Sequence, residues 1–165
     1  MQQVSSSTLF LILSACAAIF ICLTSLDLSD VVGSHFTATG TANGFMPRAA
    51  YVHLMLASGV GLPLLMVLFQ NLLLSRVNLR LNLPNREYWL APARRAQTIE
   101  FLRQHFARFG SMLVVFLCYV HWLVVRANAS FPPRLSSFWF IAGLIAFLVA
   151  TLVWSKRLFD RFRVV

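Results

Sequence analysis

Imidazole and carboxylate side chains gather at the ends of apolar segments in this 165-residue chain. Asp27 and Asp30 follow the first apolar segment, His53 lies near the start of the second, and His121 lies near the end of the third. His35 lies in the connection between the first two. If these segments cross a membrane in alternating directions, the five side chains reach the same surface.

These residue types suit two kinds of chemistry. Imidazole and carboxylate ligands bind Zn²⁺ or Cu²⁺, and histidines also titrate near neutral pH. No two histidines have the i, i+4 spacing of a site preformed on one helix. Three hypotheses therefore stand for the five residues: a metal site, a proton-responsive cluster and a structural role, of which the structural role is favoured. The five residues are His35, His53, His121, Asp27 and Asp30.

Motifs of common enzymes are absent from the sequence. It has no Gly-x-Ser-x-Gly elbow, no His-Glu-x-x-His and no phosphate-binding loop. The apolar segments carry no Asp, Glu, Lys or Arg, which argues against ion-coupled or proton-coupled transport. We therefore predict a protein that is not an enzyme and has no cofactor besides the candidate Zn²⁺ or Cu²⁺.

Four apolar segments must position the polar side chains. They cover residues 8–26, 51–74, 109–125 and 135–154. About 20 apolar residues in a helix cross the roughly 30 Å hydrocarbon core of a bilayer. The sequence therefore predicts an all-α integral membrane protein, with a single domain over residues 1–165 that forms a bundle of four transmembrane helices.

The positions of the basic residues predict the orientation. Of the 14 Lys and Arg residues, seven lie between the second and third segments and four follow the fourth. The positive-inside rule then places both termini and the connection 75–108 in the cytoplasm, with an ordered loop 27–48 outside. We interpret the net charge of +9 as topology and lipid contact rather than nucleic-acid binding. The expected location is the bacterial inner membrane.

A basic amphipathic helix is predicted in the cytoplasmic connection. Apolar residues recur at helical spacing at Ile99, Leu102, Phe106 and Phe109. We expect this helix to lie on the inner membrane surface and to run into the third segment. The residues expected to contact lipid or a cytoplasmic partner are Trp89, Arg94, Arg95 and Arg103.

Small residues mark two places where helices are expected to pack closely. Gly59 and Gly61 precede Pro63 in the second segment, where a kink is also predicted. The fourth segment carries a small residue at every fourth position, at Ala142, Ala146 and Ala150.

The outer loop carries a recognisable order of residues. His35 and Phe36 are followed by glycines, an aromatic residue and a basic residue; the complete set is His35, Phe36, Gly40, Gly44, Phe45 and Arg48. This order resembles a bacterial membrane family of uncharacterised function that is related to SdpI-like immunity proteins, whose members typically read His-Phe-Asn-x-x-Gly-x-x-Asp-Gly-Trp. Here Thr37 and Asn43 stand where members carry Asn and Asp. The resemblance covers roughly the first 90 to 110 residues and implies that these six residues bind a partner.

Two classes of function follow from these observations, and a third is less favoured. The first is a non-enzymatic inner-membrane binding protein, which by the resemblance protects the cell against a membrane-targeting or pore-forming toxin. The second is an accessory membrane subunit or small enzyme that uses the outer His and Asp residues, with a metal. The third is a path for solute permeation, for which the uncharged segments offer little support.

Overall fold

The computed structural model describes residues 5–76 and 83–163 of the chain. Residues 77–82 of the predicted cytoplasmic connection lie outside the described residues. The elements in chain order are α1 (Ser6–Thr24), β1 (Val31–Phe36), β2 (Ala42–Pro47), α2 (Arg48–Leu56), the π-helix η1 (Ala57–Gly61), α3 (Leu62–Ser75), α4 (Arg86–Trp89), α5 (Pro92–Asn128) and α6 (Ser137–Arg163).

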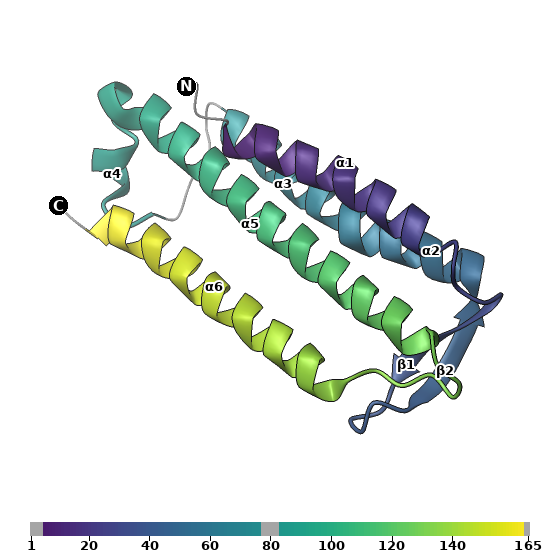
Figure 1. Ribbon diagram of the computed structural model, residues 1–165. Coiled ribbons are helices and arrows are strands. Elements are labelled where there is room, and N and C mark those ends of the chain that lie inside the picture. The colour runs from purple at the N-terminus through teal and green to yellow at the C-terminus, as the bar shows by residue number, and fades with distance from the viewer. Residues whose placement is uncertain (1–4, 77–82, 164–165) are drawn as a thin grey trace.

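Four helices are long and apolar enough to cross a membrane, which confirms the multi-pass prediction. They are Ser6–Thr24, Arg48–Ser75, Pro92–Asn128 and Ser137–Arg163. They lie along a common direction, with α1 and α2–α3 on one side of α5 and α6 on the other (Figure 1). Strands β1 and β2 lie at one end of the bundle, called here the hairpin end, and the two termini and α4 lie at the other, the α4 end (Figure 1).

The all-α prediction is wrong at the hairpin end. Strands β1 and β2 pair antiparallel, from Val31 opposite Pro47 to Phe36 opposite Ala42, with irregular register around His35. The hairpin is stable because Val32 is fully buried in a core that also contains Ile21 and Val124 from α1 and α5. A short strand pair gains most of its stability from such packing, which the composition of the loop does not reveal.

The second crossing helix widens into a π-helix where the kink was predicted. Pro63 has no N–H, so it cannot donate to the carbonyl of Gly59, and its ring would crowd that carbonyl in a regular α-helix. A π turn relieves this conflict, and the N–H of Leu62 donates to the carbonyl of Ala57, five residues earlier. A Cβ on Gly59 would lie 3.3 Å from Ile21 Cδ1, so the predicted close approach of a neighbouring helix is present.

The predicted amphipathic helix does run into the third apolar segment, and it is the first part of α5. At 1.5 Å per residue, the 37-residue α5 is about 55 Å long, and it runs in one direction through both parts (Figure 1). Its apolar face there packs on this chain: Leu102 is buried in a cluster with Leu74, Trp89 and Phe162. Helix α6 extends past the predicted limit of residue 154 and supplies Phe162 to this cluster.

Candidate partner-binding hairpin and the polar cluster beneath it

The Asn128 side chain attaches strand β1 to the end of α5. Its Oδ1 accepts a hydrogen bond from the backbone N–H of Gly33 at 2.8 Å. Its Nδ2 donates to the carbonyl of Gly33 at 2.9 Å and to that of Val124, also at 2.9 Å. The amide therefore pairs with Gly33 much as a neighbouring strand would, and it satisfies backbone groups that the hairpin itself leaves free.

The connection between α5 and α6 and the first residue of α6 hold the turn of the hairpin. The backbone N–H of Leu135 donates to the carbonyl of Gly40 at 2.8 Å, and Ser137 Oγ donates to the carbonyl of Ala38 at 2.9 Å. Gly40 has a φ of +84°, a conformation that glycine adopts without steric cost. A Cβ at this position would lie 2.1 Å from the carbonyl oxygen of Leu135, so the turn requires glycine here for a steric reason.

The hairpin exposes apolar surface and one imidazole. Val31 and Phe45 are 60% and 55% exposed, and His35 is also exposed. Gly44 lies opposite His35 in the register, and a Cβ on Gly44 would lie 2.7 Å from the Cβ of His35. Phe36 is half-buried against the core beneath the hairpin. Of the predicted partner-binding residues, His35 and Phe45 are therefore available for contact, whereas Phe36 and the two glycines shape the hairpin.

Arg48 fastens the loop between α1 and β1 to the start of α2. Its backbone N–H donates to the carbonyl of Asp30 at 2.8 Å, and its Nη1 donates to the carbonyl of Leu28 at 3.0 Å. Its Nη2 lies 3.4 Å from Asp30 Oδ1. An exposed ion pair of this kind contributes about 1 kcal/mol or less, so the backbone contacts explain the position of Arg48 better than its charge does.

A buried polar cluster of His121, Tyr51 and Thr24 lies among the helices near the hairpin end. His121 is fully buried and Tyr51 is 2% exposed. Tyr51 Oη lies 2.9 Å from His121 Nδ1, and Thr24 Oγ1 lies 2.8 Å from His121 Nε2. The two rings stack with 5.7 Å between centroids. The cluster therefore joins α1, α2 and α5.

The hydrogen bonds of this cluster determine where its protons lie. Thr24 Oγ1 donates its single proton to the carbonyl of Phe20 at 2.7 Å, so it must accept from His121 Nε2–H. In a neutral imidazole the other nitrogen, Nδ1, is then an acceptor, and Tyr51 O–H donates to it. Every member has its partner, and neither ring nitrogen of His121 is free to bind a metal.

The structure does not assemble the candidate metal ligands. Among residues 5–76 and 83–163, no three His, Cys, Asp or Glu side chains lie close enough to hold a metal ion. His53, Asp27 and Asp30 are exposed, and His121 is fully buried. Topology brings the residues to one end of the bundle, as the sequence predicts, but packing separates them there.

The predicted contact residues of the α4 end take part in packing within the chain. Trp89 is buried and lies edge-to-face with Phe162, at 5.4 Å between ring centroids. Arg94 is exposed and stacks over Tyr88, with its Cζ 3.9 Å from the ring centroid. Arg95 Nη2 donates to the carbonyl of Arg76 at 3.2 Å, and the buried Nε of Arg103 has no hydrogen-bond partner among the described residues. Trp89 is therefore a packing residue of the cluster at the α4 end.

Sequence reasoning did not identify Asn128 and Tyr51 as residues that organise this end of the protein. Asn128 was visible in the sequence as part of Asn-Ala-Ser, and Tyr51 as an aromatic residue at the end of a segment. A polar side chain at the end of an apolar helix is a signal that it has a partner nearby. The partners, Gly33 and His121, lie 95 and 70 residues away in the chain.

Comparisons of the chain with known protein families, with curated proteins and with solved structures find no match. The relationship to SdpI-like proteins therefore stays a prediction that rests on the loop residues.

Proposed function

We propose that the protein is a non-enzymatic membrane protein whose hairpin binds a protein or peptide partner at the membrane surface. The observation that carries this proposal is an anchored hairpin with Val31, His35 and Phe45 exposed on it. Exposed apolar and aromatic residues on a held scaffold are typical of binding surfaces.

Anchoring matters because binding is weakened by the entropy of ordering a loop. The hairpin is held at β1 by Asn128, at its turn by Leu135 and Ser137, and from below by the buried Val32. Three separate attachments keep the exposed residues in one arrangement before any partner arrives, so little further ordering is needed.

The partner that we propose is a toxin that inserts into the membrane or forms pores in it. Support comes from the resemblance of the hairpin sequence to SdpI-like immunity proteins, and from the positive-inside rule, which puts the hairpin outside the inner membrane. A protein in this place can bind a toxin as it reaches the bilayer. The alternative with a metal has less support, because both nitrogens of His121 already have hydrogen-bond partners.

The test uses bacteria that otherwise lack the protein and that produce the wild type, His35→Ala, Phe45→Ala or nothing. All four are challenged with peptide and protein toxins that act on the inner membrane. Survival of the cells and co-purification of the toxin with the protein are measured. We expect the wild type to increase survival and to retain the toxin, and the two variants to lose both effects. Phe138→Ala is the matched control, because Phe138 is 71% exposed near the hairpin end but lies on α6.

Unchanged protection by a chain that carries both His35→Ala and Phe45→Ala would contradict the proposal. Metal content, measured on each purified variant, separates the alternative function. A stoichiometric metal that disappears with His35→Ala would favour the accessory subunit or enzyme.

A further inference from the structure

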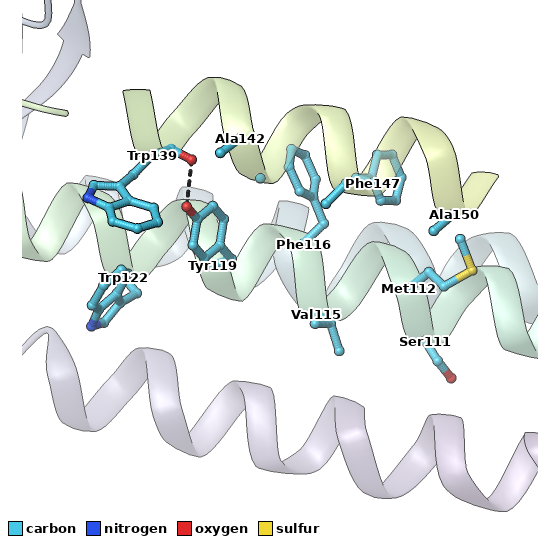
Figure 2. A pocket seen from close by; sticks show the side chains of 12 residues that line it. Ser111, Met112, Val115, Phe116, Tyr119, Trp122, Trp139, Ala142, Phe147 and Ala150 are labelled. Carbon is cyan, nitrogen blue, oxygen red and sulfur yellow. Dashed lines mark hydrogen bonds between the residues drawn. The ribbon is translucent and has the colours of Figure 1, made fainter. Parts of the chain in front are cut away.

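A ridge of side chains on α5 separates two apolar grooves. Val115, Tyr119 and Trp122 recur at spacings of four and three, so they lie on one face of the helix. All three line both grooves, one between α5 and α6 and the other between α5 and α1. Figure 2 shows Tyr119 beside α6, while Val115 and Trp122 are directed toward α1.

The first groove is open along the small-residue stripe of α6. It has a volume of about 770 Å³, and Ala142, Ala146 and Ala150 are among the residues that line it on the α6 side. Figure 2 shows Ala142 near Tyr119 and Ala150 near Met112 of α5. Gly143 makes the close contact, because a Cβ there would lie 2.1 Å from the ring of Tyr119. The closest approach of α5 is thus at Gly143, beside the stripe, while Ala146 and Ala150 of the stripe are exposed.

The second groove is smaller and runs beside the first. It has a volume of about 340 Å³ and is lined on the α1 side by Leu13, Cys16, Ala17 and Phe20. Both grooves are almost wholly apolar. The first extends from Ser111 to Trp122 on α5, about 16 Å at 1.5 Å per residue, which is close to half of the roughly 30 Å hydrocarbon core.

A positive charge lies where the ridge ends. Arg126 follows Trp122 by one turn, about 6 Å along the helix, and is exposed. Its Cζ lies 5.6 Å from the ring centroid of Trp122. Within the described ranges 5–76 and 83–163, no carboxylate is within ion-pair distance of Arg126; the ion pairs there are Arg48–Asp30 and Lys156–Asp160. Trp122 and Trp139 at the same level fit the interface of a bilayer, where lipid headgroups begin.

We propose that this face binds one anionic phospholipid with two acyl chains, whose phosphate contacts Arg126 and whose chains occupy the two grooves. The two grooves on either side of one ridge match two chains that leave one headgroup, and the length of the larger groove matches one leaflet. A second copy of the protein fits less well. A symmetric dimer across this face would bring two Arg126 residues together, and like charges oppose such pairing.

The test is native mass spectrometry of the full chain in mild detergent with added dioleoyl phosphatidylglycerol. We expect the wild type to retain one lipid. Arg126→Gln should weaken retention about fivefold, the effect of removing one basic residue near an anionic headgroup. Ala146→Phe, which fills the larger groove, should reduce retention by at least the same factor. Lysophosphatidylglycerol, which has one chain, should bind more weakly than the two-chain lipid.

Matched controls lie close to both changes. Arg134→Gln removes another exposed arginine at the same end of the bundle, and Val149→Phe adds a phenylalanine to α6 outside the groove. Both variants should retain lipid as the wild type does. Equal retention by all variants, or equal binding of the one-chain lipid, would overturn the proposal. So would a dimer that Ala146→Phe dissociates while no lipid is retained. Because Arg126 is exposed, Arg126→Gln keeps the test decisive if Ala146→Phe does not fold.

Discussion

Replacing Asn128 with alanine should release the hairpin from α5 without unfolding the helices. The change removes three hydrogen bonds, two to Gly33 and one to the carbonyl of Val124. Each contributes about 1 kcal/mol net, and a buried backbone group left without a partner costs about 1–3 kcal/mol. Gly33 is buried, so we estimate a loss of about 2–4 kcal/mol in the free energy of opening the hairpin.

Hydrogen exchange measured by mass spectrometry in mild detergent reports this loss directly. Since about 1.4 kcal/mol corresponds to a factor of ten, amide exchange across residues 31–47 should accelerate by about 30-fold to 1,000-fold. Exchange in α3 should stay unchanged because the hairpin packs mainly on α2 and α5. Asn128→Asp keeps the size of the side chain and an acceptor for Gly33 N–H but loses the donor, so it should accelerate exchange as well.

Asn43→Ala is the control for this experiment. Asn43 is an exposed asparagine in β2, and its side chain makes no hydrogen bond to another described residue, so exchange should remain within about threefold of the wild type. An Asn128→Ala chain whose hairpin exchanges as slowly as that of the wild type would refute the claim that this amide holds β1. Equal acceleration by Asn43→Ala would refute it too.

Three further changes test the packing of the protein. Gly40→Ala puts alanine in a left-handed conformation, which costs about 1–2 kcal/mol, and adds a steric clash with a backbone oxygen. It should therefore lower the unfolding temperature in detergent. An unchanged unfolding temperature would mean that the turn is not held tightly. Tyr51→Phe leaves His121 Nδ1 without a donor and should lower the free energy of unfolding, measured by circular dichroism melts, by about 1–3 kcal/mol. Tyr119→Phe should lower it less, because the hydrogen bond of Tyr119 is exposed. Gly143→Ala should lower the unfolding temperature by pushing the Tyr119 ring aside. Adding Tyr119→Ala to this variant should recover most of the lost stability. A double variant no more stable than Gly143→Ala would refute this contact.

Much of the fold could be predicted because membrane crossing is a local property. A helix satisfies its backbone hydrogen bonds within the segment, so about 20 apolar residues are enough to predict one. The boundaries were less predictable. The continuation of α5 through residues 92–108 was predicted, but α6 also extends past its apolar segment, where Phe162 joins Leu102 of α5 in one buried cluster. That contact joins residues far apart in the chain and has no local signal.

The candidate site was predicted in part. The loop motif directed attention to His35 and Phe45, which the hairpin exposes. Topology made His121 a candidate metal ligand, with a structural role favoured, and the structure buries it between Thr24 and Tyr51. Sequence order and topology bring residues to the same end of a bundle, but only side-chain packing decides whether they face one another or are separated.

The sequence by itself determined the four apolar helices, the close approach at Gly59 and the basic character of one end, since each depends on composition or on neighbours within a few residues. The tertiary structure alone decided three features: that the loop is a hairpin held by Asn128, that His121 is satisfied internally, and that a ridge on α5 has one groove toward α6 and another toward α1. Each of these depends on a contact between distant segments, whose geometry is set only when the helices pack.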